Sequence, residues 1–318
     1  MKELFRNCLS VEERDGWYRP LRFTQGQLEE YAKVEGWKIR SVAASSVCLS
    51  FRTAAESVRI KYRLGGMARN WASFDLTVDG VLCQSVEVTD KEGAVCFTLP
   101  GDSERELSVY LPQFAEVELM APEADAPLCP AKKRESLWLA LGDSITQGMV
   151  ARRSSSAYPT MVSEQLGCEV INAGVGGISF NHSELDFIGR EPSLITVALG
   201  CNDWFAYKSR EELKTAVRMY LDKLVSLYRC RNIFVILPIW LSTAAETVHG
   251  KTFAEHRELI RQVAEEYGFI RVIDGYELLP HDTAFYNDPK DERQVHPGDE
   301  GMILYGMGIL KRLREAGV

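Results

Sequence analysis

Apolar and polar residues alternate along much of the chain between residues 47 and 120, with the period of two that is typical of half-buried β-strands. The clearest run covers residues 58–64, where valine, isoleucine, tyrosine and leucine are separated by arginine or lysine. Asp79-Gly80 separates two more such runs, and this dipeptide is a strong signal for a β-hairpin. Several short strands at roughly ten-residue spacing predict an antiparallel sandwich or jelly roll, with one short helix near residues 25–32.

The pattern changes near residue 130. Residues 121–135 contain three of the chain's twelve prolines among small and charged residues, which is typical of an exposed linker. At about 150 residues per domain, a chain of 318 residues also suits two domains. We therefore predict an all-β domain over residues 1–130 and a second domain over residues 131–318.

Beyond the linker, short apolar runs alternate with amphipathic stretches that have the period of a helix. The predicted strands cover residues 137–141, 169–172, 194–199, 233–237 and 270–273, and the predicted helices cover residues 211–228, 253–267 and 301–314. This alternation predicts an α/β fold, in which a parallel sheet is covered by helices on both faces. Such sheets place their binding sites at the carboxyl ends of strands.

Composition and charge exclude several classes of function. The 37 basic and 45 acidic side chains give a net charge of -8, which disfavours nucleic acid as a partner and suits a neutral substrate better than a polyanion. The longest apolar run, residues 233–241, contains a proline and is far shorter than the ~20 residues of a bilayer span. The first residues lack the pattern of a signal peptide, so we expect a cytoplasmic protein with no membrane partner.

Cysteines and histidines give no sign of a metal site or a disulfide framework. The eight cysteines lie far apart without a C-x-x-C spacing, and a chain of this size does not need disulfides, so we expect reduced and mostly buried thiols. The five histidines show no metal-ligand spacing. We therefore expect neither a metal nor a cofactor.

Two residues at predicted element ends suit nucleophilic catalysis. Ser144 follows the first predicted strand of the α/β part, at a turn into a helix where backbone N–H groups favour negative charge. The alternative is that Ser144 only caps that helix. His296 stands just before the last predicted helix and suits a general base, although a lone histidine is more often structural.

Two further segments suit the binding of an oxyanion. The glycine-rich loop that ends at Gly177 permits close approach of backbone N–H groups, although a tight turn explains it equally. A dinucleotide-binding loop is disfavoured because Ser179 stands where the third glycine of that motif is required. Asn202, after the third predicted strand, carries an amide donor of the kind that stabilises oxyanions, and Asn-Asp is otherwise an ordinary turn pair. The adjacent Cys201 is predicted to be a packed thiol.

These four segments, in this order, resemble the motif blocks of the SGNH (GDSL-type) hydrolases over about residues 135–318. The resemblance implies a flavodoxin-like three-layer α/β/α domain. It also implies that Ser144 is the nucleophile and His296 the base, with an oxyanion hole made by the N–H groups of Ser144 and Gly177 and by the amide of Asn202.

One position departs from the family pattern. The family usually has an aspartate three residues before the histidine, and here that residue is Arg293. Asp291 is the first candidate to orient His296 instead, with Asp288 and Glu292 behind it. A Ser-His dyad with a backbone carbonyl in place of the acid is an equal alternative.

The N-terminal region is similar, less specifically, to the jelly-roll domains that precede the hydrolase domain in carbohydrate acetylesterases. This likeness favours a serine esterase that removes a small acyl group, acetyl above all, from a carbohydrate, so the expected partner is a small acyl ester. Trp204 and Trp240 are either stacking faces for a sugar or core residues. A thioesterase or lysophospholipase of the same family is one alternative, and a catalytically decayed carbohydrate-binding protein, suggested by Arg293, is another.

Overall fold

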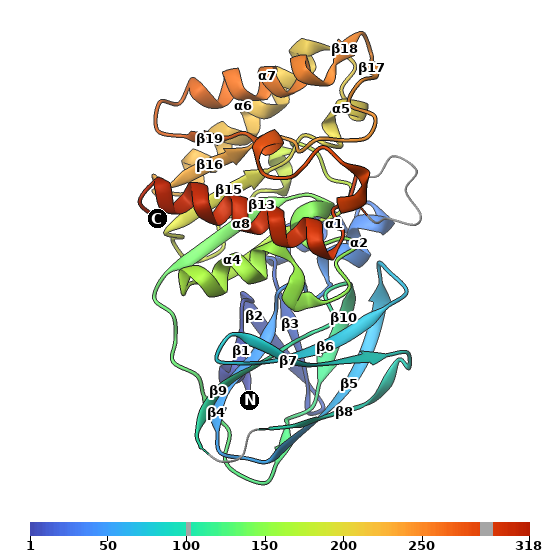
Figure 1. The fold of residues 1–318 in the computed structure, drawn as a ribbon, viewed down its shortest axis with the longest axis vertical. Helices are drawn as coiled ribbons and strands as arrows, with labels where there is room; N and C mark the ends of the chain where they lie inside the picture. The colour runs from blue at the N-terminus through green and yellow to red at the C-terminus, as the bar shows by residue number, and fades with distance from the viewer. Residues whose placement is uncertain (100–102, 287–294) are drawn as a thin grey trace.

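The computed structural model describes residues 1–99, 103–286 and 295–318. Two antiparallel sheets lie at one end of the molecule, and a parallel sheet between helices lies at the other (Figure 1). This arrangement confirms the predicted fold class, an all-β sandwich followed by an α/β fold.

The antiparallel sheets form a sandwich. The first sheet has the order β1 (Phe5–Arg6), β4 (Cys48–Thr53), β9 (Arg105–Tyr110), β6 (Ala72–Val78) and β7 (Val81–Val88), with β12 (Cys129–Pro130) paired to β4. The second has the order β11 (Glu123–Ala124), β5 (Ser57–Met67), β10 (Ala115–Leu119), β3 (Trp17–Leu21) and β2 (Ser10–Arg14), with β8 (Glu92–Thr98) paired to β5. One core cluster contains Phe51 and Leu76 from the first sheet and Ile60 and Val117 from the second, so the two sheets bury a common set of alternating side chains.

The turn between β6 and β7 is the predicted hairpin. Asp79 and Gly80 have φ angles of 49° and 80°, and two successive positive values are what the favoured two-residue hairpin turn requires. Glycine adopts this conformation without strain, and aspartate is one of the few other residues that tolerate it. The local sequence therefore fixes the register of these two strands.

Two short helices follow β3. The predicted helix is α1 (Gln25–Tyr31), which begins at a capping box formed by Thr24 and Gln27. The second helix, α2 (Glu35–Ser41), was not predicted. It is as short as α1, but its N-cap residue is Val34, which provides no side-chain cap, so its start carries no sequence signal. Phe23 and Tyr31 pack into the core of the α/β part rather than into the sandwich.

The parallel sheet has the order of a flavodoxin-like fold. Its strands, from one edge to the other, are β14 (Glu169–Gly174), β13 (Leu137–Gly142), β15 (Leu194–Ala198), β16 (Ile233–Ile236) and β19 (Arg271–Ile273). The chain therefore moves from the second strand back across the first to reach the third. The carboxyl ends of strands at such a point of reversal are the usual binding place of open α/β sheets.

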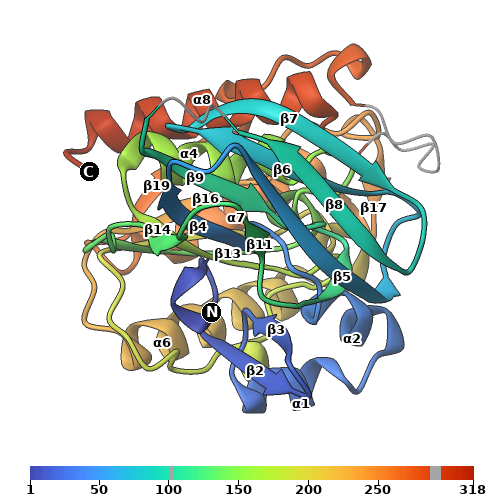
Figure 2. The same cartoon turned by 90° about the horizontal axis from the view of Figure 1, so that it is seen from below.

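Helices cover both faces of this sheet, as predicted. α6 (Arg210–Leu227) and α7 (Phe253–Glu265) pack with α1 on the face that carries Leu139, and α4 (Tyr158–Leu166) and α8 (Asp299–Glu315) pack on the face that carries Trp138. Figure 2 shows α4 and α8 on the opposite side of the molecule from α6. The short elements are η1 (Lys2–Leu4), α3 (Ser144–Gln147), η2 (Ser154–Ser156), η3 (His182–Glu184), α5 (Asp203–Ala206), β17 (Thr247–Val248), β18 (Lys251–Thr252), η4 (Gly275–Glu277) and η5 (Thr283–Phe285).

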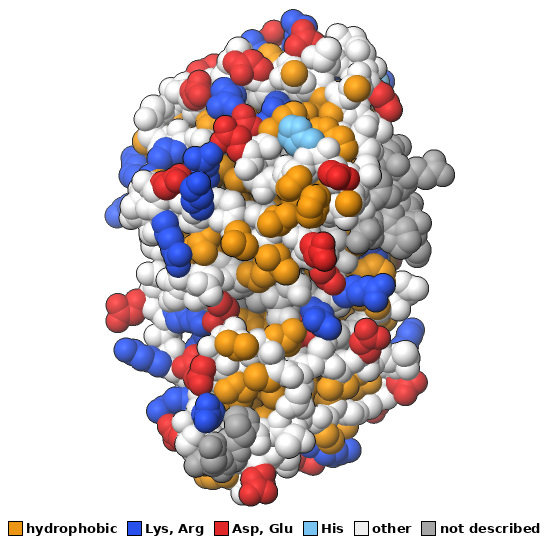
Figure 3. Space-filling view, viewed as in Figure 1, with side chains coloured by type: hydrophobic (Ala, Val, Ile, Leu, Met, Phe, Trp, Pro, Cys, Tyr) orange, Lys and Arg blue, Asp and Glu red, His pale blue; other side chains and the backbone are white. Residues whose placement is uncertain are grey.

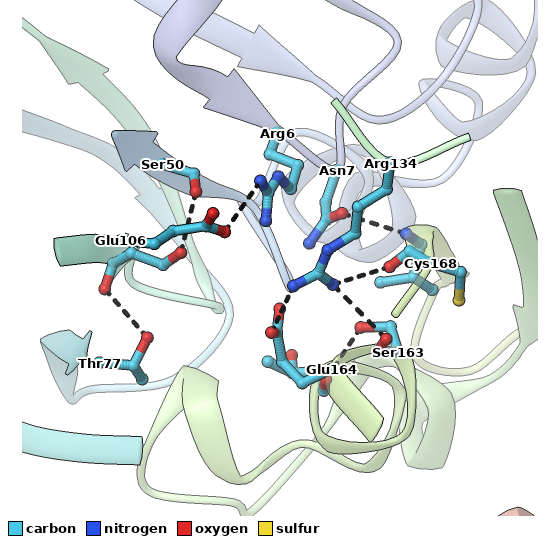
Figure 4. A network of polar contacts seen from close by, with 12 residues as sticks. Arg6, Asn7, Ser50, Thr77, Glu106, Arg134, Ser163, Glu164 and Cys168 are labelled. Atoms are coloured by element: carbon cyan, nitrogen blue, oxygen red, sulfur yellow. Dashed lines mark hydrogen bonds and ion pairs between the residues drawn. The ribbon is translucent and has the colours of Figure 1, made fainter. Parts of the chain in front are cut away.

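Polar side chains join the sandwich to α4 and β14 (Figure 4). Asn7 accepts a hydrogen bond from the backbone N–H of Val170 at 3.0 Å. Glu164 on α4 accepts from the Tyr110 hydroxyl at 2.7 Å and from the Arg134 guanidinium at 2.5 Å. We call the contacts among Asn7, Tyr110, Arg134, Glu164 and Val170 the α4 junction.

An apolar groove lies beside this junction, between the β6–β7 hairpin and helices α4 and α8. It has a volume of about 470 Å³ and is lined by Leu82, Ile303 and Met307 among others. Figure 3 shows hydrophobic side chains gathered over the part of this face where α8 and α4 lie in Figure 1. Ser144, Gly177, Asn202 and His296 are not among the described residues that line the groove.

The cysteines correct one prediction. All eight are unpaired, but only Cys48, Cys168 and Cys201 are buried. Cys83, Cys96 and Cys129 are exposed on strands of the sandwich. In β8, Cys96 lies between the buried Val95 and Phe97, so its side chain falls on the solvent face, and composition alone does not reveal this. No helix among the described residues is long and apolar enough to span a bilayer.

Candidate active site

Ser144 and His296, which are far apart in the sequence, meet in the structure. Ser144 is the first residue of α3, directly after β13, and His296 precedes α8. The Ser144 Oγ and the His296 Nε2 are 2.8 Å apart, within hydrogen-bond distance. A hydroxyl that is hydrogen-bonded to an imidazole is the arrangement in which a serine is activated as a nucleophile.

The helix cap beside Ser144 is provided by its neighbour. Asp143 is the N-cap of α3, and its Oδ1 accepts from the backbone N–H of Ile145 at 2.9 Å. The alternative in which Ser144 only caps the helix is therefore wrong. Asp143 is buried, and burial raises its pKa to about 6, although the nearby His296 acts in the opposite direction.

The loop that ends at Gly177 packs against α3. The N–H of Val175 donates to the Gly142 carbonyl at 3.1 Å, and the N–H of Gly176 donates to the Gln147 side chain at 2.9 Å. Gly177 itself is exposed and has a φ of 88°, in the left-handed region that favours glycine. The loop is thereby held beside the start of α3 with Gly177 open to solvent.

Asn202 connects the loops that follow β13 and β14. Its Nδ2 donates to the Ile178 carbonyl at 2.8 Å and lies 3.5 Å from Asp143 Oδ2. An amide nitrogen carries two hydrogens, so one is held by Ile178 and the other has only this longer contact. Ser144, His296, Asn202 and the loop of Gly177 thus lie together at the carboxyl edge of the sheet.

The predicted orienting acid cannot be placed in this arrangement. Asp291 lies outside the described residues, and so do Asp288, Glu292 and Arg293. Within the described ranges, no group of three or more His, Cys, Asp or Glu side chains is arranged to hold a metal ion.

The structure shows the burial and the contacts of two tryptophans and one cysteine near the site. Trp204 is fully buried and packs on Phe253, so it is a core residue and not a stacking face. Trp240 is half-buried and stacks on His281 at 5.8 Å. Cys201 is buried, and burial raises the pKa of its thiol, which confirms the predicted packed thiol.

Two buried acids behind Asn202 were not predicted. Asp203 accepts from the N–H of Phe180 at 2.8 Å, and burial raises its pKa to about 7. Burial also raises the pKa of Glu184 to about 8, and the charges of Glu30 and Asp203 add to this. The Asn-Asp pair in the sequence marked the position of Asp203, but nothing in the sequence indicated that its carboxyl is enclosed.

Helix α2 supplies two further residues that sequence reasoning missed. If Gly177 carried a Cβ, that atom would lie 3.5 Å from Arg40 Nη1 and 3.5 Å from Trp37 Nε1. Both side chains belong to the region that precedes the linker and reach a loop more than 130 residues later, as the Arg40–Gly176 hydrogen bond shows. No motif surrounds them, so no local signal identifies this contact.

Known proteins resemble this chain in sequence and in fold. The sequence model of the GDSL-like Lipase/Acylhydrolase family matches residues 140–303. A comparison with curated protein sequences finds no match.

Solved structures with the same fold cover nearly the whole chain. A salicylyl-acyltransferase, SsfX3, from a tetracycline biosynthetic pathway is 20% identical with a TM-score of 0.83, covering 99% of this chain and 94% of its own. A family two carbohydrate esterase from Clostridium thermocellum, in complex with cellohexaose, is 15% identical with a TM-score of 0.66, covering 85% and 91%. An acetyl xylan esterase from the rumen bacterium Butyrivibrio proteoclasticus is 13% identical with a TM-score of 0.61, covering 85% and 90%.

The family match includes the positions of Ser144, Gly177, Asn202 and His296, and it spans just over half of the chain. The protein therefore belongs to the GDSL-like lipase/acylhydrolase family and is an ester hydrolase.

Proposed function

We propose that the protein is a serine esterase that removes a small acyl group, acetyl above all, from a carbohydrate. The observation that carries this proposal is the 2.8 Å contact between Ser144 Oγ and His296 Nε2 at the carboxyl edge of the parallel sheet. The carbohydrate part rests on the shared fold with the carbohydrate esterase and the acetyl xylan esterase.

In the first half of the reaction, His296 Nε2 accepts the proton of the Ser144 hydroxyl while Oγ attacks the ester carbonyl. The carbonyl oxygen becomes an oxyanion, which accepts hydrogen bonds from the N–H groups of Ser144 and Gly177 and from the second N–H of Asn202. The carbon–oxygen bond to the alcohol then breaks, and the alcohol leaves with the proton from His296.

In the second half, His296 accepts a proton from water, and the resulting hydroxide attacks the acyl-enzyme. The bond to Ser144 Oγ breaks, the acid is released, and Oγ recovers its proton from His296. Asn202 suits its role because Ile178 fixes one amide hydrogen and thereby orients the other. Asp291 remains our candidate for the group that orients the imidazole.

Acyl transfer to a second alcohol is the other candidate function. The observation in its favour is that the salicylyl-acyltransferase shares the fold over 99% of this chain. The same acyl-enzyme would then react with an acceptor hydroxyl in place of water. Measuring the acid and the new ester formed when an alcohol is added separates the two outcomes.

The deciding experiment compares the wild type with Ser144→Ala on p-nitrophenyl acetate. We expect kcat to fall by at least about 1000-fold, as for other serine hydrolases that lose their nucleophile. A fluorophosphonate probe should label the wild type at Ser144 and leave the variant unlabelled. Equal rates in both proteins would contradict the proposal.

Two companion measurements refine the proposed esterase function. We expect the rate to fall as the acyl chain is lengthened from acetyl to octanoyl, and a strong preference for long chains would instead favour the lysophospholipase alternative. We also expect Asp291→Asn to lower kcat far less than His296→Ala does. A loss as deep as that of the histidine variant would show that Asp291 completes a triad.

A further inference from the structure

Two hydrogen-bond donors of α2 converge on the exposed Gly177. Arg40 Nη1 and Trp37 Nε1 each lie 3.5 Å from the point where a Gly177 Cβ would stand. Within the described residues, the indole N–H of Trp37 has no acceptor, and the Arg40 guanidinium has one, the Gly176 carbonyl at 2.9 Å. An arginine carries five N–H donors, so most of those on Arg40 remain available beside the proposed oxyanion hole.

Arg22 shows what an arginine with a structural role looks like in this protein. Arg22 is 1% exposed, and each of its three nitrogens donates to a backbone carbonyl. Arg40, by contrast, is half-buried and faces a solvent-exposed glycine. Backbone carbonyls thus use every nitrogen of Arg22, whereas the one hydrogen bond of the Arg40 guanidinium, to Gly176, leaves its other donors unused.

The backbone of Arg40 is held in place by two donors. Its carbonyl accepts from Arg22 Nη2 at 2.9 Å and from Gln147 Nε2 at 3.0 Å. The same Gln147 side chain accepts from the N–H of Gly176 and is fully buried. Arg40 is thus fixed to α3, the helix that begins with Ser144, and less ordering entropy is lost when a ligand binds.

Arg69 is the charged neighbour that acts on the Arg40 guanidinium. Burial, and after it the positive charge of Arg69, lower the pKa of the Arg40 guanidinium. No carboxylate of the described ranges forms an ion pair with Arg40 or affects that pKa. A half-buried cation that has no carboxylate partner among the described residues is stabilised by an anionic ligand.

We propose that Arg40 and Trp37 form a subsite for a carboxylate or a similar anionic group on the substrate, next to the reacting ester. This inference rests on the proposed esterase function and narrows its substrate class to anionic esters. It also departs from the expectation, based on net charge, of a neutral substrate, because the charge of the whole chain says nothing about one pair of side chains.

The subsite could bind an anion on the alcohol part or on the acyl part of the ester. The test therefore uses two matched pairs of esters, one for each case. The first pair is 4-acetoxybenzoate and 4-acetoxybenzamide. The second is the 4-methylumbelliferyl ester of glutarate with a free carboxylate and its methyl-protected form. Rates measured with Ser144→Ala are subtracted as background. In at least one pair, we expect wild-type kcat/KM to be about 10-fold or more higher for the anion.

Arg40→Gln should lower kcat/KM for the preferred anion about 10- to 100-fold more than kcat/KM for its neutral partner, as expected when one charged hydrogen bond to the anion is lost. Any loss with the neutral ester measures the hydrogen bond between Arg40 and the Gly176 carbonyl. Trp37→Phe, which keeps a ring and removes the N–H, should cause a smaller loss for the anion alone. Lys38→Gln is the matched control, because Lys38 is an exposed cation of the same helix. This variant should change kcat/KM for neither ester.

Several outcomes would overturn the subsite. One is a wild type that hydrolyses the neutral esters through Ser144 with no preference for the anions, which leaves the esterase function intact. Another is an equal loss for charged and neutral esters in Arg40→Gln with an unchanged melting temperature. Arg40→Lys should recover part of the preference, because it keeps the charge.

A binding measurement keeps the subsite testable if no ester is hydrolysed. Glutarate and 4-hydroxybenzoate are titrated into Ser144→Ala and into Ser144→Ala/Arg40→Gln by calorimetry. We expect at least one of these acids to bind at least about 10-fold more tightly when Arg40 is present. Equal affinity, or no binding to either protein, would contradict the anionic subsite.

Discussion

Several contacts attach the region before the linker to the α/β part, and two of them differ in chemistry. At the α4 junction, Glu164 pairs with Tyr110 and Arg134 at the partly exposed edge of a helix. At the other place, which we call the α2 junction, Arg22 and Gln147 hold the backbone around Arg40 and Gly176 in the interior.

The difference shows which attachment affects catalysis. The α4 junction lies beside α4 and β14, away from Ser144, and Glu164 joins it through side-chain contacts with Tyr110 and Arg134. The α2 junction holds backbone groups of the loop that carries Gly177, so a disturbance there reaches the site directly. We therefore expect the α4 junction to affect stability alone and the α2 junction to affect both stability and turnover.

The largest effect should come from Arg22→Met. This change keeps much of the apolar stem but removes the donors to the carbonyls of Ala43, Asn172 and Gly174 in a buried place. Unsatisfied buried carbonyls cost about 1–3 kcal/mol each, so the free energy of unfolding should fall by about 3 kcal/mol or more. Urea unfolding measures this loss. In conditions where the variant remains folded, kcat/KM for p-nitrophenyl acetate should also fall at least about 10-fold. Unchanged turnover would show that the loop does not depend on this junction.

Tyr110→Phe is the matched change at the α4 junction. It removes one hydroxyl that donates to a carboxylate and keeps the buried ring, so we expect a loss of about 1–2 kcal/mol in the free energy of unfolding. Turnover should stay within about 2-fold of wild type, because no residue of the site touches Tyr110. A fall in kcat similar to that of Arg22→Met would remove the contrast between the junctions.

The last effect concerns pH and the acid beneath α1. Gln27 of α1 donates to the Glu184 carbonyl at 2.9 Å, and burial raises the pKa of the Glu184 carboxyl to about 8. A raised pKa means that the folded state binds this proton more tightly. The stability it contributes is therefore fully present below the ordinary glutamate pKa and is lost as pH rises through about 8.

Glu184→Gln tests this pH dependence. The wild type should lose at most about 1.4 kcal/mol of stability per pH unit from this group between pH 5 and 8, and the variant should have a flatter profile. Chemical unfolding at several pH values measures the slope. Asp203→Asn is the companion variant, because burial raises that pKa as well. If the free energy of unfolding depended on pH in the same way in the wild type and both variants, these acids would be excluded as the source of the pH dependence.

Much of the fold was readable from the sequence because it depends on local periodicity. The strands between residues 47 and 120 followed the alternation of apolar residues, whereas β2 and β3 lie before it and show no such alternation. Asp79-Gly80 marked a turn that only a few residue types adopt. Ser144 and His296 were found because the chemistry requires particular residue types at element ends. The structure brings them within 2.8 Å.

The features that could not be predicted from the sequence depend on tertiary contacts. Helix α2 begins without a capping side chain, and the approach of Arg40 to Gly177 depends on how two distant segments pack. The enclosure of Asp203 and Glu184 follows from the packing of several elements around them, which a linear pattern does not contain. The exposed side of Cys83, Cys96 and Cys129 is likewise a matter of which face each strand buries.

The orientation of the Gln147 amide has a consequence for protein engineering. Its oxygen faces the N–H of Gly176 and its nitrogen faces the carbonyl of Arg40, so the two ends are not interchangeable. Glutamate has the same shape but lacks the donor, and methionine lacks both groups. A chimera that grafts this sandwich onto the catalytic domain of another family member therefore has to carry a glutamine at this position, or the grafted helix α2 loses its anchor.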